Sequence, residues 1–233
     1  MSQRDWKAIW GSKELGPDQG PTLARLIAVD GFSSEFGRVD GVGPWLDYVE
    51  MQAQRLGVAP GDSLYEVGCG GGAFLYPFWQ RGHRVAGADQ AANLIAIARQ
   101  AMPGAALQSL EARDIPRREP ADIVVSNGVF LYFPDEDYAA TVLRAMVAKA
   151  RKSVGVFDVC DLATKAEAIA ARKAVMGEAD YEARYRGLDH LYLDRRWFFR
   201  SLEDLPVRVE IADQSLEGYG NNQYRFNVYI HLR

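Results

Sequence analysis

Cysteine is scarce in this sequence, with two residues among 233. Cys69 and Cys160 lie far apart and form no metal-type or redox-type spacing, so neither a disulfide framework nor a zinc site is indicated. The sequence offers no other clear cluster of metal ligands, and we expect no bound metal. A reducing, cytoplasmic setting fits this cysteine usage best.

Long apolar runs and an excess of positive charge are also missing. Residues 1–6 lack the apolar segment of a secretory signal, and no uninterrupted apolar run approaches membrane-spanning length. The formal net charge of −4 gives no general electrostatic reason to bind nucleic acid. We therefore expect a soluble protein that has neither a membrane nor a nucleic acid as its partner.

The length of the chain and its hydrophobic fraction of 48% suit one substantial core. Because no internal repeat or linker divides it, residues 1–233 are expected to form a single domain. From residue 63 onward, strand-like and helix-like patterns alternate, which is typical of a mostly parallel sheet with helices on both faces. The strands are expected at about 63–67, 84–88, 106–110, 121–126, 153–159, 206–211 and 225–231, and the helices between them at 73–81, 91–101, 136–150 and 194–203.

The last expected strand differs from the others. Phe226, Val228 and Ile230 alternate with polar neighbours after a short turn rich in glycine and asparagine, which indicates an antiparallel partner for the sixth strand. The sequence thus predicts a Rossmann-like, doubly wound α/β fold with seven strands.

Two segments fall outside this alternation. Residues 1–60 are expected to contain helices that form an amino-terminal lid. Residues 160–193 follow the fifth strand, beginning with an alanine-rich helix and continuing into a cluster of aromatic and ionisable side chains. An insertion at that point would lie above the carboxyl ends of the strands and cover a substrate there.

A glycine-dense turn joins the first expected strand to the first helix after it. Gly68, Gly70 and Gly72 satisfy the loose dinucleotide fingerprint, which by itself is weak evidence for any one ligand. Asp89, 17 residues after Gly72, is suited to accept hydrogen bonds from ribose hydroxyls, as NAD and S-adenosylmethionine both require. Glu66 separates the two, because a carboxylate there would repel a pyrophosphate and favour a ligand that bears an ammonium group.

This pattern resembles the class I S-adenosylmethionine-dependent methyltransferases, closely over residues 63–159 and only in layout elsewhere. The resemblance implies that S-adenosylmethionine is the cofactor and S-adenosylhomocysteine the product. It also implies that Tyr132 faces the substrate. The Asn-Pro-Pro-aromatic signature of methyltransferases that act on nucleobase amines is absent after the fourth strand, which removes an argument for a nucleic-acid substrate. The cofactor-binding residues that the resemblance implies are Glu66, Gly68, Gly70, Gly72, Asp89, Gln90, Glu111, Ala112 and Asn127.

Further candidate substrate residues lie outside the matched region. Tyr181 and Tyr185 belong to the expected insertion, and Asn221 and Tyr224 belong to a polar loop that is equally well explained as an ordinary hairpin turn. Trp10, with Trp6, either fastens the first helix or covers a sulfonium by cation–π attraction.

His190 is the candidate catalytic residue, because an imidazole can act as a general base near neutral pH; packing is the alternative role for it. We expect the chain to transfer a methyl group to oxygen or nitrogen, or possibly sulfur, of a small polar metabolite. The alternatives are an NAD-dependent oxidoreductase and a cofactor-binding protein without catalytic activity. The oligomeric state is left open.

Overall fold

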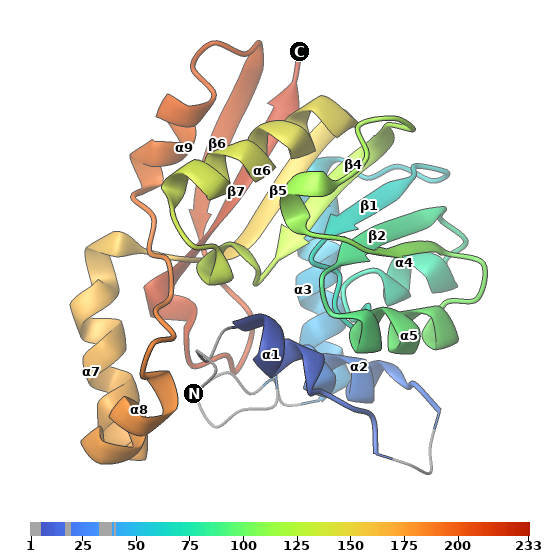
Figure 1. Cartoon of the computed structure of the whole chain (residues 1–233). Helices are drawn as coiled ribbons and strands as arrows, with labels where there is room; N and C mark the ends of the chain where they lie inside the picture. The colour runs from blue at the N-terminus through green and yellow to red at the C-terminus, as the bar shows by residue number, and fades with distance from the viewer. Residues whose placement is uncertain (1–5, 17–19, 33–38, 40) are drawn as a thin grey trace.

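A seven-stranded sheet in the order β3-β2-β1-β4-β5-β7-β6 forms the centre of the molecule (Figure 1). The structure is a computed structural model that describes residues 6–16, 20–32, 39 and 41–233. Every strand runs parallel to its neighbours except β7, which is antiparallel to both β5 and β6. The strands are β1 (Leu64–Val67), β2 (Val85–Asp89), β3 (Ala106–Ser109), β4 (Ala121–Asn127), β5 (Ala150–Cys160), β6 (Val207–Asp213) and β7 (Arg225–Leu232).

The predicted α/β fold, the seven strands and the antiparallel last strand are therefore confirmed. Two boundaries differ from the expectation by three residues, and the others by one or two at most. The strand β5 begins at Ala150 rather than at residue 153, because it follows helix α6 without an intervening loop. The helix after the glycine turn begins only at Tyr76, because Gly72 has φ +94° and the following residues continue as turns.

Helices cover both faces of the sheet, and each face has its own hydrophobic core. On one face, α3 contributes Trp45 and Val49, and α4 contributes Phe78. On the other, α6 contributes Val142 and Met146, while α9 adds further aromatic side chains. These helices are α3 (Val42–Leu56), α4 (Tyr76–Gln80), α5 (Ala92–Ala101), α6 (Glu136–Lys149) and α9 (Arg195–Ser201).

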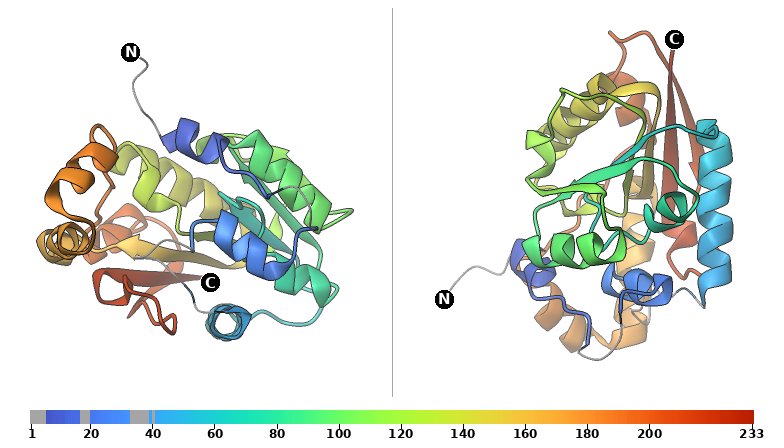
Figure 2. Two further views of the ribbon diagram at one scale, coloured as in Figure 1. Left: turned by 90° about the horizontal axis from the view of Figure 1, so that it is seen from below. Right: turned by 90° about the vertical axis from the view of Figure 1, so that its right-hand side faces the viewer.

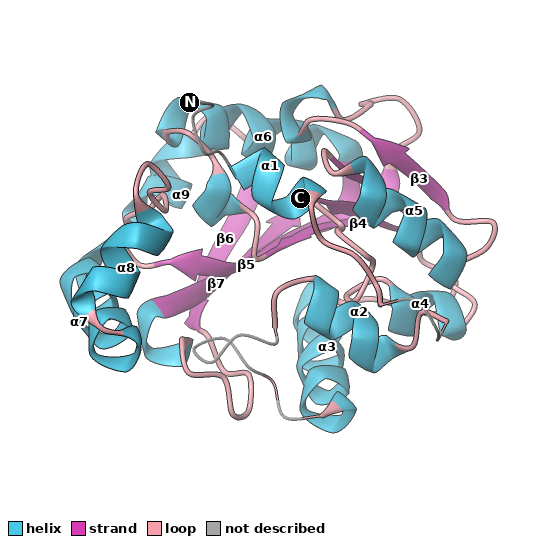
Figure 3. Cartoon of the chain, turned by 60° about the horizontal axis from the view of Figure 1, so that its bottom comes forward, coloured by secondary structure: helices cyan, strands magenta, loops and turns pink. Residues whose placement is uncertain are grey.

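Four further helices gather at the edge of the sheet where the parallel strands end (Figures 1 and 2). They are α1 (Trp6–Gly11), α2 (Leu23–Val29), α7 (Lys165–Met176) and α8 (Glu178–Tyr185). Figure 3 looks toward this edge and shows α1 between α5 on one side and α7 and α8 on the other. Residues 1–60, the expected amino-terminal lid, contain α1, α2 and α3; residues 1–5, 17–19, 33–38 and 40 of this segment lie outside the described residues.

The strand order has a direct consequence for ligand binding. The chain runs from β1 outward to β2 and β3, then returns to β4 on the other side of β1. The loops after β1 and β4 therefore leave the sheet in opposite directions and open a crevice between them, which is where doubly wound sheets bind their ligands. Among the described residues, every helix is too short or too polar to cross a membrane.

Candidate functional site

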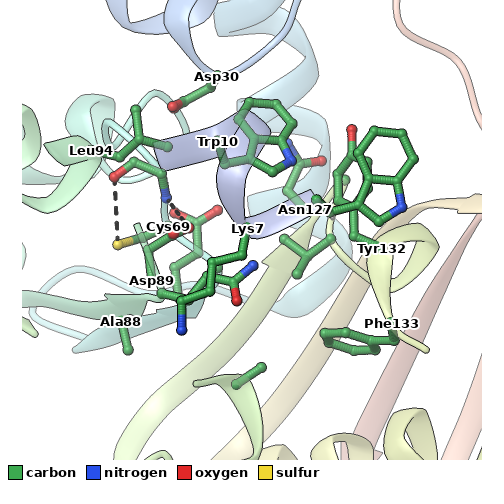
Figure 4. Close-up of a pocket in the computed structure, with 18 of the residues that line it drawn as sticks. Lys7, Trp10, Asp30, Cys69, Ala88, Asp89, Leu94, Asn127, Tyr132 and Phe133 are labelled. Carbon is green, nitrogen blue, oxygen red and sulfur yellow. Dashed lines mark hydrogen bonds between the residues drawn. The ribbon is translucent and has the colours of Figure 1, made fainter. Parts of the chain in front are cut away.

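A cavity of about 560 Å³ lies at the carboxyl ends of β1, β2 and β4 (Figure 4). The strands contribute Glu66, Asp89 and Asn127 to its wall, and α1 contributes Trp6, Lys7 and Trp10. The cavity is large enough for a ligand of the size of a nucleoside with an attached amino acid. It therefore lies where the strand order opens the sheet, with α1 on its outer side.

The glycine loop after β1 has a backbone that only glycine adopts without strain. Gly68, Gly70 and Gly72 all have positive φ angles, of +74°, +52° and +94°. A side chain at any of the three would also collide with a neighbour: with Val129 at Gly68, with Asp30 at Gly70 and with Met102 at Gly72. Gly68 and Gly70 line the cavity. Gly72 does not, and packs instead against α5 and against Met102, which follows α5.

Asp89, at the end of β2, is joined to the glycine loop. Its Oδ2 accepts a hydrogen bond from the backbone N–H of Gly70 at 2.9 Å, and its Oδ1 accepts one from that of Ala91 at 2.8 Å. Burial raises the pKa of this carboxyl group, and the two N–H donors oppose that rise. Two backbone N–H groups therefore hold the predicted ribose acid on the cavity wall.

Glu66 is the most deeply buried of the cavity acids, with 2% of its surface exposed. Its Oε2 has no hydrogen-bond partner among the described residues. Burial, followed by the nearby Asp30 and Asp89 carboxyl groups, raises the pKa of Glu66 well above its usual range. A buried, unpartnered carboxyl oxygen on a cavity wall is costly alone and fits a ligand that brings an ammonium group.

Asp30 is a cavity residue that the sequence did not identify. It follows α2, and its Oδ1 and Oδ2 accept hydrogen bonds from the backbone N–H groups of Gly71 at 2.5 Å and of Ala73 at 2.9 Å. Burial is the main cause that raises the pKa of Asp30 to about 7; the hydrogen bonds oppose this, and Asp89 adds to it. No motif spacing points to Asp30, because it lies 41 positions before Gly71 in the chain.

The residues expected at the adenine end, Gln90, Glu111 and Ala112, all line the cavity. Glu111 accepts a hydrogen bond from Lys7 Nζ at 3.1 Å and another from the hydroxyl of Tyr138 at 3.3 Å. Both members of the Lys7–Glu111 pair are substantially exposed. The structure thus brings α1 to the same wall as the loop after β3.

Asn127, at the end of β4, lines the cavity and accepts a hydrogen bond on Oδ1 from the hydroxyl of Tyr48 at 3.0 Å. Next to it, the Ser126 hydroxyl donates to the Val67 carbonyl at 2.9 Å and joins the ends of β4 and β1. Helix α3 also donates a hydrogen bond from Trp45 Nε1 to the carbonyl of Ala73 at 3.0 Å. These bonds hold the loops after β1 and β4 at a set separation.

Aromatic rings of α1 meet the segment after β4 at the outer end of the cavity. The Tyr132 ring lies 4.8 Å from that of Trp6 and 5.4 Å from that of Trp10, between ring centroids. Trp6 stacks on His190 at 4.9 Å with 7° between the ring planes, and its Nε1 donates to the Asp189 carbonyl at 3.2 Å. The amino-terminal helix, the β4 loop and the insertion therefore meet in one cluster of rings.

His190 lies behind this ring cluster rather than on the wall of the large cavity. It lines a second cavity of about 260 Å³, together with Tyr181 and Tyr185. Burial lowers the pKa of His190 well below its ordinary value, and the charges of Arg225 and Arg172 lower it further. The imidazole is thus neutral at physiological pH and is a weak base in this arrangement.

Asn221 and Tyr224 lie in neither cavity. Asn221 is buried in the turn before β7, and Tyr224 packs against a small cluster that contains Leu131 and Tyr192. The same turn is held by Asn222, whose amide donates to the Leu216 carbonyl at 2.6 Å. The turn explanation therefore accounts for this loop without a ligand. In the described parts of the chain, no three His, Cys, Asp or Glu side chains are arranged to hold a metal ion.

Residues 64–153 match the sequence profile of a methyltransferase domain. This stretch runs from β1 to the start of β5 and contains Glu66, the glycine loop, Asp89 and Asn127. No curated protein matches the sequence.

Many solved structures share the fold at low sequence identity. One is CalS10, an amino pentose methyltransferase from Micromonospora echinaspora bound to S-adenosylmethionine (TM-score 0.62, 13% identity, 94% of this chain and 100% of that chain covered). Another is the geranyl diphosphate C-methyltransferase of Streptomyces coelicolor (TM-score 0.60, 16% identity, 97% and 94% covered). A third is the magnesium protoporphyrin IX methyltransferase of Synechocystis (TM-score 0.58, 14% identity, 94% and 87% covered). At these identities, the likeness shows a common fold.

Proposed function

We propose that this chain is a class I S-adenosylmethionine-dependent methyltransferase and that it methylates an oxygen or nitrogen atom of a small polar metabolite. The observation that carries the proposal is the make-up of the large cavity. Its inner wall bears carboxyl groups suited to the cofactor, and its outer end bears aromatic rings and one further acid, Asp189.

S-Adenosylmethionine, when bound, supplies a methyl group on a positively charged sulfur that is already activated for displacement. The protein then has to orient the methyl donor and the acceptor and to exclude water from them. Orientation alone contributes on the order of 7 kcal/mol or more in favourable cases. Asp89 is placed to accept hydrogen bonds from ribose hydroxyls, and Glu66 to accept one from the ammonium group. The indole rings of Trp6 and Trp10 cover the cavity and keep water from it.

The charge of the cavity wall favours a methyl acceptor that carries no anionic group near the atom to be methylated. Five acids line the cavity, against one basic side chain, Lys7, among the described residues; the acids are Asp30, Glu66, Asp89, Glu111 and Asp189. An anionic acceptor would be repelled by this surface, whereas a neutral or cationic one would not. The aromatic outer end is also suited to hold a cationic amine.

The two segments outside the strand and helix alternation form the proposed cover of the substrate. Residues 1–60 supply α1 as a lid, and residues 160–193 supply the segment from Gly187 to Asp189 to the cavity wall. Tyr132 is the proposed substrate contact between them, because its ring touches both indoles of α1 and lines the cavity. Tyr181 and Tyr185 would contact only an acceptor that reaches the second cavity.

Transfer of labelled methyl from S-adenosylmethionine to the metabolites of a cell extract tests this proposal. A labelled product whose new methyl lies on oxygen or nitrogen is the expected result, and its structure identifies the acceptor. Label found only on carbon, or on protein or nucleic acid, would contradict the proposal. Calorimetric titration with NAD serves as the parallel test of the oxidoreductase alternative, for which tight NAD binding would be required.

A further inference from the structure

The glycine loop of this chain binds an anion that belongs to the chain itself. Loops of this kind, in which left-handed glycines alternate with other residues, point successive backbone N–H groups toward one place and commonly hold a phosphate there. Here Gly70 and Gly72 supply the left-handed angles. The N–H groups of Gly71 and Ala73 are already bonded to the two oxygens of Asp30.

Asp30 also has a surface that faces the ligand. It lines the large cavity with Glu66 and Asp89, and it is only partly buried, which leaves some of its surface open to the cavity. Figure 4 shows its carboxyl group on the same side of the cavity as the glycine loop. A loop that would otherwise present N–H donors to a ligand therefore presents a carboxylate.

The fit between Asp30 and the loop is close on both sides. A Cβ at Gly70 would strike the Asp30 carboxyl group, and one at Gly71 would lie 3.2 Å from Asp30 Oδ1. On the other side, a Cβ at Gly31 would lie 2.9 Å from the Trp10 ring. Asp30 is thus held between the loop and the helix that covers the cavity.

We propose that Asp30 is the specificity-determining residue of this site: by occupying the N–H groups of the glycine loop, it excludes phosphate-bearing cofactors and presents a negative charge to a cationic one. This inference rests on the proposed function and adds a residue outside the strand motifs to it. It also assigns a second reason why the loop rejects a dinucleotide, besides the charge of Glu66. The positive charge of the ligand is matched by Asp30 at the loop and by Glu66 at the end of β1.

Two variants separate the space that Asp30 fills from the charge that it carries. Asp30→Asn keeps an acceptor oxygen on the loop but removes the charge, whereas Asp30→Ala removes both and exposes the N–H groups. Asp137→Asn, on the exposed first turn of α6, is the matched control. Each protein is titrated with S-adenosylmethionine and, separately, with inorganic pyrophosphate, and its fold is checked by circular dichroism.

Wild-type protein and the control are expected to bind S-adenosylmethionine and not pyrophosphate. Both Asp30 variants should bind S-adenosylmethionine about tenfold more weakly or worse, as expected when a charge-assisted contact is lost. Only Asp30→Ala should gain pyrophosphate binding.

Affinities for S-adenosylmethionine within about twofold of wild type in the Asp30→Asn variant would overturn the proposal, and this variant decides the question if Asp30→Ala fails to fold. A folded Asp30→Ala protein that does not bind pyrophosphate would also overturn it. If wild-type protein fails to bind S-adenosylmethionine, the proposed function is wrong. The titrations with pyrophosphate then still show whether Asp30 keeps phosphate groups away from the glycine loop.

Discussion

Three carboxyl groups, those of Asp30, Glu66 and Asp89, determine the charge at the inner end of the cavity. The pKa values of all three are raised, with burial as the largest cause. Because the pKa of Asp30 is raised to about 7, part of this charge is suppressed by protonation near neutral pH. A cationic ligand favours the ionised forms, so ligand binding and proton release are linked.

Cofactor affinity should accordingly depend on pH. The pKa of Asp30 is about 7 against an ordinary value of 3.8, so affinity for S-adenosylmethionine is expected to rise as the pH increases from about 5.5 through 7 and then level off. Calorimetry in buffers with different ionisation enthalpies measures both the affinity and the protons released. Asp30→Asn should flatten the profile, and an unchanged slope in that variant would assign the pH dependence to other groups.

Ionisation of Asp30 should lower the free energy of unfolding of the protein, whereas it should raise the affinity for S-adenosylmethionine. A carboxyl group whose pKa is raised by folding stabilises the folded state below its unfolded pKa, and this contribution is lost as the pH rises through the folded value. For Asp30, the window runs from 3.8 to about 7. Urea unfolding across this window should show a smaller decline in unfolding free energy for Asp30→Asn than for wild type.

Replacing Asp89 by Ala removes an acceptor of two backbone hydrogen bonds as well as the proposed ribose contact. We expect the affinity for S-adenosylmethionine to fall by more than about tenfold, because charged hydrogen bonds to a ligand are among the stronger contacts of a binding site. Fluorescence titration measures this effect, with Asp137→Asn as the control. Affinity equal to that of wild type would contradict the placement of the ribose beside β2.

His190 provides a test of whether a base is used. A His190→Gln variant with lower turnover and unchanged cofactor affinity would support the sequence-based expectation that the imidazole takes a proton from the acceptor. Because its pKa is lowered by burial and by two arginines, the pH profile of turnover should not show a group that titrates near its ordinary value of 6.5. Normal turnover in the variant would leave His190 as a packing partner of Trp6.

Helix α1 is the element on which access to the cavity depends. It has six residues and none of them is buried, so its position depends on a few contacts made by its side chains. Trp10 supplies two of these contacts, with the Tyr132 ring and with the backbone at Gly31. The Asn93 amide further donates to the carbonyls of Trp10 and Lys13 at 3.1 Å and 2.6 Å.

Replacing Trp10 by Ala should therefore loosen α1 and speed the release of bound S-adenosylmethionine and S-adenosylhomocysteine alike. Stopped-flow fluorescence measures the release rate, which we expect to rise about tenfold or more because a large ring contact is lost. Ile9→Ala is the matched control on the same helix. Ile9 lines neither cavity, so this variant should release ligand at nearly the wild-type rate. Equal release rates in the two variants would contradict the inference that packing of the Trp10 ring holds α1 in place.

For the molecule as a whole, the cavity brings together segments that lie between Trp6 and Asp189 in the chain. Its wall contains residues from α1 in the amino-terminal segment, from the ends of β1, β2 and β4, and from the insertion around Gly187. A ligand bound there would contact all of these parts at once. It would therefore stabilise the whole fold rather than one loop.

Thermal unfolding should show this effect. A ligand present at one hundred times its dissociation constant adds about 2.7 kcal/mol to the unfolding free energy, and for a domain of this size each kcal/mol raises the melting temperature by about 2–4 °C. We expect S-adenosylmethionine to raise the melting temperature accordingly and NAD to leave it unchanged. A shift with NAD of the same size would contradict the cofactor assignment.

Much of the sheet was predictable because the signals for it are local. Buried parallel strands such as Ile123–Val125 are uninterrupted apolar runs, and the alternation in β7 marks its different partner. The first helix after the glycine loop was placed too early, because Ala73 to Leu75 are apolar but remain in turns after Gly72. Propensity cannot register that departure, since it depends on how Gly70, Gly71 and Ala73 are bonded by Asp89 and Asp30.

By itself, the sequence determined the apolar patterns from which the strands were predicted. It also determined the acids at the ends of β1 and β2. Glu66 and Asp89 lie close to the glycine turn in the sequence, so their roles can be predicted from the spacing between these residues. The position of Asp30 on the glycine loop was decided only by the tertiary structure, as were the stacking of Trp6 on His190 and the absence of Asn221 from the cavity wall. Each of these depends on packing between segments far apart in the chain, and no local pattern encodes such a contact.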